Sequence, residues 1–84
     1  MEKRIRKTTM HPEVIALGKR IESIIKSKNL KTRYVAYDAD LDVENLRKYI
    51  KGRQEMKYTT FLRIAKALSV SPCELVGIDK PTLD

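Results

Sequence analysis

Cysteine, histidine and glycine are scarce in this chain of 84 residues, and each shortage argues against a class of protein. The single cysteine, Cys73, has no partner for an intramolecular disulfide, so packing must hold the fold, as in a reducing compartment. One thiol and one imidazole, that of His11, are too few for a metal site or a catalytic pair. The three glycines stand apart and form no phosphate-binding loop. We therefore expect no enzyme, no cofactor and no metal.

Long apolar runs are also missing from the sequence. None approaches the roughly 18 residues that a membrane span needs, and the basic start, residues 1–7, is not followed by the apolar stretch of a signal peptide. We therefore expect a cytoplasmic protein. The length suits one domain with one small core.

Positive charge is in excess, with 18 Lys and Arg residues against 11 Asp and Glu and a pI near 9.7. A polyanion is the expected partner, and a membrane surface is the competing one. We divide the chain into a flexible basic arm (1–11), a folded domain (12–77) and a tail (78–84). The arm either follows a phosphate backbone or minor groove, or is simply solvated.

Helical periodicity organises the first part of the domain. Pro12 suits the start of a helix that reaches Lys28, and Gly18 within it marks a close helix contact. The main apolar stripe is expected to consist of Val14, Leu17, Ile21, Ile24 and the stem of Lys28. Ile25 lies off this main stripe, and it either widens the stripe or forms a satellite contact with the basic arm or another subunit. Asn29, which tolerates the left-handed conformation, ends this helix.

Two helical patterns then follow on a tight turn. The first, residues 32–39, has Val35, Ala36 and Ala39 on its inner side. Asp40 suits a left-handed turn position, with Leu41 tucked beneath the turn. Asp42 is expected to cap the second helix, which Gly52 ends. Its apolar positions are Val43, Leu46, Tyr49 and Ile50, and its cations lie opposite. This spacing predicts a helix-turn-helix.

Two more helices complete an all-α chain without a strand candidate or repeat. An apolar pattern predicts the fourth helix, and Ser71-Pro72-Cys73-Glu74 predicts a capping box that starts a short fifth one, ended by Gly77. The apolar positions of the fourth helix are Tyr58, Phe61, Leu62, Ile64, Ala65 and Leu68, with Arg63 and Lys66 outside. Helical spacing favours packing over base stacking for Tyr34, Tyr37, Tyr49 and Tyr58.

This compact five-helix order resembles the phage-repressor and Cro-like (XRE-type) helix-turn-helix family, over about Leu17 to Val76. The resemblance is carried by Leu17-Gly18, Ile21, Val35-Ala36, Ala39-Asp40-Leu41, Leu46, Gly52 and the run from Leu62 to Ser71. The chain departs from the family's usual glycine at Asn29, Asp40 and Ser69. It also departs at Thr32, where the family often has glutamine, and at Ile50, where it often has glutamate. We expect Ile50 to pack against Met56 or Phe61.

The resemblance implies a lambda-repressor-like domain whose third helix enters the major groove of double-stranded DNA. The residues that would face bases are Val43, Glu44, Arg47 and Lys48. Arg47 or Lys48 would donate to guanine, Glu44 would accept from cytosine and Val43 would touch a thymine methyl. The phosphate-binding candidates are Thr32, Arg33, Lys51, Arg53, Gln54, Lys57 and Tyr58.

Four carboxylates, those of Asp38, Asp40, Asp42 and Glu44, lie where DNA would approach. Asp40 and Asp42 are explained by the turn and the helix cap. Glu44 either reads cytosine or weakens binding.

The expected function is that of a sequence-specific DNA-binding transcriptional regulator, a repressor acting as a homodimer on a two-fold operator. Its dimer surface would include Cys73, Val76 and Ile78. Restriction-modification controllers and antitoxins of toxin-antitoxin pairs share this layout and size. The alternative is a protein-interaction module on the same fold, with a toxin-like partner and little or no DNA reading.

Overall fold

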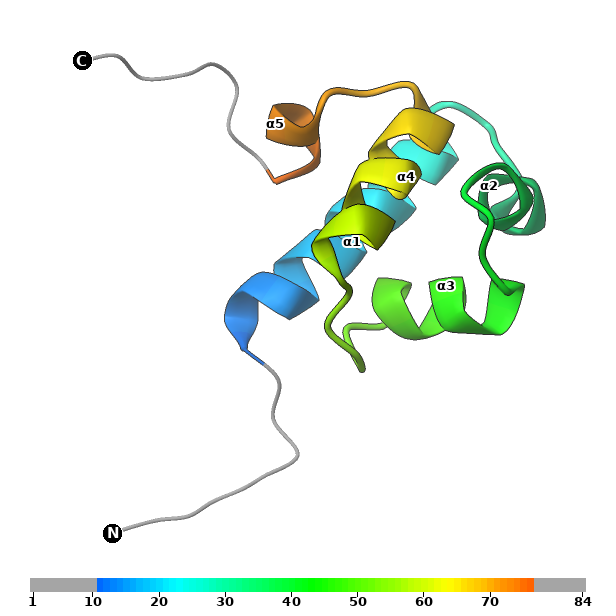
Figure 1. Cartoon of the computed structure of the whole chain (residues 1–84). Helices are drawn as coiled ribbons and strands as arrows, with labels where there is room; N and C mark the ends of the chain where they lie inside the picture. The colour runs from blue at the N-terminus through cyan, green and yellow to red at the C-terminus, as the bar shows by residue number, and fades with distance from the viewer. Residues whose placement is uncertain (1–10, 77–84) are drawn as a thin grey trace, which may run out of the picture.

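The computed structural model describes residues 11–76, which form five α-helices (Figure 1). The helices are α1 (Pro12–Ser27), α2 (Thr32–Asp38), α3 (Val43–Ile50), α4 (Tyr58–Leu68) and α5 (Pro72–Leu75). No strand occurs within residues 11–76. α1 packs on α3 and α5, while α2 packs on α3 and α4, and α4 also meets α5. The predicted all-α class with a helix-turn-helix of α2 and α3 is therefore confirmed.

α1 begins at Pro12, as predicted, but its buried face differs from the predicted stripe. His11 lies within the predicted arm, yet it is the N-cap of α1, and its Nδ1 accepts a hydrogen bond from the Glu13 amide at 3.0 Å. Gly18, Ile21 and Ile25 are buried, whereas Ile24 is only partly buried. Of the two alternatives for Ile25, a wider stripe is confirmed, because Ile25 belongs to the buried core and α3 packs against the side of α1 that carries Gly18.

Three non-glycine residues in the connections adopt the left-handed conformation. Asn29, Asp40 and Ser69 have φ angles of 57°, 59° and 60°. Ser69 is the C-cap of α4. Asn29 and Asp40 were predicted for these positions because their short polar side chains tolerate this backbone region better than most. The departures from glycine therefore leave the turns intact.

The end of α4 is tied to the end of α1 by a lysine. Lys28 Nζ donates to the carbonyl oxygens of Leu68 and Ser69 at 2.8 and 3.3 Å. The expectation that the stem of Lys28 extends the apolar stripe is replaced by this role, in which a cation meets the carbonyls at the negative end of α4.

α5 begins with the predicted capping box. The Ser71 hydroxyl accepts from the Glu74 amide at 3.2 Å, and the Glu74 carboxylate accepts from the Ser71 amide at 3.1 Å. The predicted stop at Gly77 lies outside the described residues.

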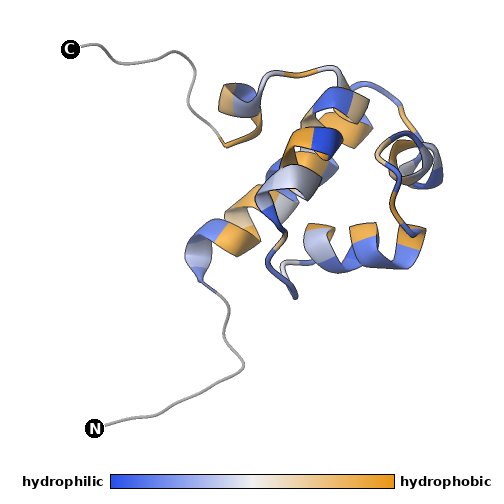
Figure 2. Cartoon of the chain, viewed as in Figure 1, coloured by the Kyte–Doolittle hydropathy of each residue, from blue (hydrophilic) through white to orange (hydrophobic). Residues whose placement is uncertain are grey.

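The core draws aliphatic side chains from every helix. Its fully buried large side chains include those of Ile21, Leu46, Ile64 and Leu75. Ala36 of α2 and Ala39 just after α2 are buried too, and their small side chains let α4 approach closely. Figure 2 shows the apolar side of α3 turned toward the other helices and its hydrophilic side turned outward. α3 therefore rests on the core with one face free.

Candidate nucleic-acid interface

α3 is seated against α1 through a glycine. A Cβ atom added to Gly18 would overlap the backbone carbonyl oxygens of Tyr49 and Ile50, so only glycine permits this approach. The close contact predicted at Gly18 is confirmed. Beyond the last turn, Gly52 has a φ of 70° and lies against Ile15. The C-terminal end of α3 is thus held in place by backbone contacts.

Ile50 packs in a different place from the one expected. It is partly buried and lines a hollow with Ile15 and Ile25 of α1, while Met56 and Phe61 line a separate pocket. The position at which the family often has glutamate therefore extends the core toward α1.

The free face of α3 carries the predicted base-reading side chains. Glu44, Arg47 and Lys48 are exposed, whereas Val43 packs partly against the core and shows only part of its side chain. Arg47 Nη1 donates to Glu44 Oε2 at 3.0 Å. This pair is solvated on both sides, so it is worth little to stability, but it orients the guanidinium in the free protein.

One exposed polar residue of α3 was not among the predicted base readers. Asn45 lies on the flank of the free face, and its amide could pair with the adenine edge. Its exposure could have been inferred from the helical periodicity, because Asn45 is not among the apolar positions of this helix.

The N-terminal end of α3 is acidic. Asp42 is the N-cap residue, as predicted, but its side chain makes no capping hydrogen bond, so that part of the prediction is wrong. Asp42 borders a shallow hollow together with Asp38, Asp40 and Tyr37.

The predicted phosphate-binding residues fall into separate groups. Thr32, Lys51 and Arg53 line the hollow that also contains Arg47. Gln54 and Tyr58 line the other pocket. Arg33 is exposed in the first turn of α2, and Lys57 is the exposed N-cap of α4. The first group is continuous with the free face of α3.

Three tyrosines were expected to pack and do not. Tyr34, Tyr37 and Tyr58 are 62, 82 and 73% exposed, and only Tyr49 is buried. The packing interpretation is wrong for these three because smaller neighbours, Val35, Ala36 and Thr60, fill the positions that face the core.

An arginine from α4 supports the turn between α2 and α3. Arg63 Nε donates to the carbonyl oxygen of Ala39, the C-cap of α2, at 3.0 Å. The sequence placed Arg63 outside, and its side chain is indeed largely exposed, but its head group reaches the turn. Arg63 is therefore a positioning residue for the helix-turn-helix.

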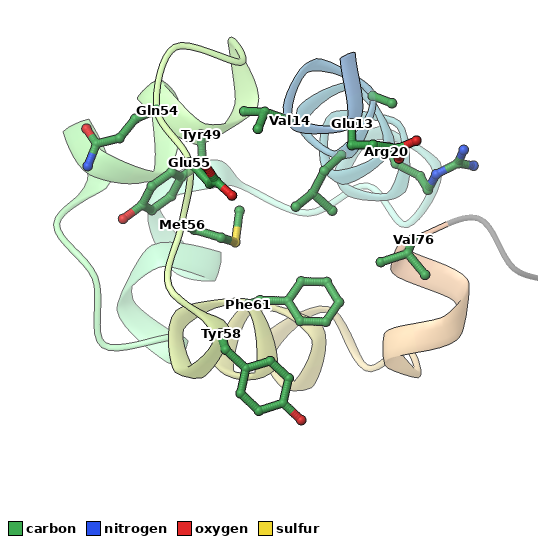
Figure 3. A pocket seen from close by; sticks show the side chains of 12 residues that line it. Glu13, Val14, Arg20, Tyr49, Gln54, Glu55, Met56, Tyr58, Phe61 and Val76 are labelled. Carbon is green, nitrogen blue, oxygen red and sulfur yellow. The ribbon is translucent and has the colours of Figure 1, made fainter. Parts of the chain in front are cut away.

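An apolar pocket of about 290 Å³ opens among α1, the α3–α4 connection, α4 and the end of α5 (Figure 3). Val14, Met56, Phe61 and Val76 point toward its interior, and Glu13, Arg20 and Glu55 are also among its lining residues. Of the predicted dimer residues, Cys73 and Val76 are exposed, and Ile78 lies outside the described residues.

The part of the chain from residue 11 to residue 76 contains no cluster of three or more His, Cys, Asp or Glu side chains arranged to hold a metal ion. None of its helices has the length and apolar character required to cross a membrane.

Comparisons with known proteins agree with this geometry. The model of the Cro/C1-type HTH DNA-binding domain matches residues 20–81, whereas no curated protein matches the chain. Among solved structures, the restriction-modification controller protein C.AhdI from Aeromonas hydrophila is 23% identical, with a TM-score of 0.74 over 77% of this chain and 98% of that one. The clp gene regulator ClgR from C. glutamicum is 21% identical, with a TM-score of 0.75 over 79% and 86%.

The two solved structures share the fold, and the family model covers most of the chain, including α2, α3 and the turn between them. This protein belongs to the Cro/C1-type helix-turn-helix DNA-binding domain family.

Proposed function

We propose that this protein is a sequence-specific regulator of transcription, a repressor that binds a two-fold DNA operator as a homodimer. The observation that carries the proposal is the free face of α3, where Glu44, Arg47 and Lys48 project from a helix seated on the core. Family membership makes double-stranded DNA the partner. The same family gives no reason to expect catalysis, and the proposed location is the cytoplasm or nucleoid.

In the proposed complex α3 lies in the major groove and its exposed face meets base edges. Lys48 and Arg47 donate to guanine, Glu44 accepts from cytosine, and the exposed part of Val43 meets a thymine methyl. Of the seven phosphate candidates, Thr32, Lys51 and Arg53 share a hollow with Arg47, so they can meet the backbone beside the base contacts.

A dimer is proposed because a single α3 spans few base pairs. Two copies on half-sites about one helical turn apart would combine their affinities. We place the contact on the surface of Cys73, Val76 and Ile78, of which the first two are exposed. Because C.AhdI is a restriction-modification controller protein, such a controller is one specific form of this proposal, and an antitoxin is another.

Selection of bound duplexes from a random pool tests the proposal. One duplex family should be enriched, and its two half-sites should be related by two-fold symmetry. Affinity should then fall with salt at a log-log slope near −0.9 for each phosphate contact. Lys48→Gln should reduce the affinity for selected duplexes more than the affinity for random ones. The control Lys66→Gln makes the same charge change at an exposed position of α4 and should reduce both affinities equally. Absence of enrichment would refute sequence-specific binding, and sedimentation of a monomer on one half-site would refute the dimer.

A second function is favoured by the acidic end of α3. Asp38, Asp40 and Asp42 oppose approach of a phosphate backbone, and they suit a protein-interaction module with a basic, toxin-like partner. Salt-independent or undetectable duplex binding would favour this alternative.

A further inference from the structure

A hollow of about 690 Å³ lies between α1, the start of α2 and the C-terminal end of α3. Four of its lining residues are aliphatic: Ile15, Ile25, Leu30 and Ile50. Leu30 is 39% exposed, Ile15 and Ile50 are partly buried, and Ile25 is almost covered. We call this site the α1–α3 hollow. It offers apolar surface next to the proposed DNA-binding face.

Cations surround this apolar surface. Lys19 and Lys26 come from α1, and Arg47, Lys51 and Arg53 come from α3 and the residues after it. The acid that also lines the hollow, Glu22, lies 3.9 Å from Lys26 in a solvated pair, and Arg47 is paired with Glu44. The lining of the hollow therefore has a clear excess of positive charge.

A DNA backbone matches only half of this surface. Phosphates would satisfy the lysines and arginines, but a sugar-phosphate chain brings no aliphatic side chains to cover the isoleucines and Leu30. An occupant with carboxylates at its edges and aliphatic side chains at its centre would match both halves.

We propose that the α1–α3 hollow binds an acidic amphipathic segment of a protein partner. Leucine-like side chains of the segment cover Leu30, Ile15 and Ile50, and its carboxylates meet the surrounding lysines and arginines. Arg47, Lys51 and Arg53 are also proposed DNA ligands, so the segment and the operator compete for one protein molecule. This regulatory consequence rests on the proposed function, whereas binding of the segment does not.

Two helical peptides of equal charge test the chemistry. The probe has roughly four turns with leucines on one face and glutamates on the other, and its control has serines in place of the leucines. The probe should bind at least about tenfold more tightly than the control, because burial of a single leucine side chain is enough to raise the affinity by that factor. Amide chemical shifts should move around Leu30 and Lys51. Equal binding of both peptides, no binding, or shifts centred on Phe61 and Met56 would overturn the proposal.

Protein variants separate a protein partner from DNA. Leu30→Ser should reduce the affinity for the probe by about fivefold or more, because it removes aliphatic surface without changing charge. The same variant should leave the affinity for the duplex unchanged. Lys19→Gln should reduce the affinity for the probe more than Lys66→Gln does, although Lys66→Gln makes the same charge change on α4. Equal losses of probe and duplex binding in Leu30→Ser or Lys19→Gln, with the fold intact by circular dichroism, would make the hollow a DNA surface and overturn the proposal.

Competition completes the experiment. In wild-type protein the probe should displace a labelled selected duplex, while the serine peptide at equal concentration should not. A ternary complex would overturn the proposed exclusion. If no duplex binds at all, the proposed function fails, but the direct probe titration still decides whether the hollow accepts an acidic segment.

Discussion

The two ends of α3 differ in both charge and attachment. The N-terminal end gathers Asp40, Asp42 and Glu44, and its capping residue makes no side-chain hydrogen bond. The C-terminal end carries cations and is held by the backbone approach at Gly18 and the left-handed Gly52. Both charge patterns favour the helix dipole. In the proposed complex, Lys51 and Arg53 beyond the end of α3 supply affinity, whereas Glu44 and the basic side chains of its exposed face supply discrimination.

Gly18→Ala should have the largest effect, because it disturbs the firmly held end. The new methyl group would overlap the carbonyl oxygens of Tyr49 and Ile50, and their displacement should destabilise the protein by about 2–3 kcal/mol despite the better helix propensity of alanine. Thermal unfolding should show a melting temperature lower by roughly 10–20 °C. Ser23→Ala, on the exposed side of α1, is the control and should change little. An unchanged melting temperature would show that α3 is not seated at Gly18.

Neutralising the basic end should produce the next largest effect. Lys51→Gln combined with Arg53→Gln should reduce the log-log salt slope of duplex binding by about 1.8, and at about 0.15 M salt the affinity should fall roughly 30-fold. The affinities for selected and for random duplexes should fall by the same factor. The measurement is fluorescence anisotropy across salt concentrations, and a changed sequence preference would contradict the division of roles.

Glu44→Gln tests the acidic end. If Glu44 reads cytosine, the variant should lose about tenfold discrimination at one base pair, because the amide can also donate to other bases. Competition between the selected duplex and its single-base variants measures this. Uniform tightening on every duplex would instead identify Glu44 as a repulsive charge.

Asp42→Ala should have the smallest effect. Since the Asp42 side chain makes no capping bond, its loss should cost less than about 0.5 kcal/mol, whereas Ser71→Ala, which breaks a formed capping box, should cost about 1 kcal/mol. Urea denaturation of the two variants compares them directly. A larger loss for Asp42→Ala would show that its carboxylate does cap α3.

Features set by local chemistry were predictable from the sequence. The left-handed Asn29 and Asp40, the capping box at Ser71 and the close approach at Gly18 each depend on residue type and spacing. The pair between Glu44 and Arg47 also follows from their i, i+3 spacing on a helix.

Features set by tertiary packing were not predictable in the same way. Periodicity finds an apolar stripe, but the packing of the other helices on α1 buries Ile25 more deeply than Ile24, which packs against the edge of the core. Exposure of Tyr34 and Tyr37 depends on which neighbours fill the core. The grouping of Thr32 with Lys51 and Arg53 requires α1 and α3 to be placed first, so the sequence supplied these site residues without their arrangement.

The long-range hydrogen bonds have a consequence for synthesis of the protein. Arg63 secures the end of α2 across 24 positions, and Lys28 meets Leu68 across 40. A nascent chain that has emerged only as far as Gly52 already contains all of α3, but it lacks Arg63 and Leu68 and so cannot form either hydrogen bond. Only a chain that extends to Leu68 can form both hydrogen bonds, which join α2 and the end of α1 to α4.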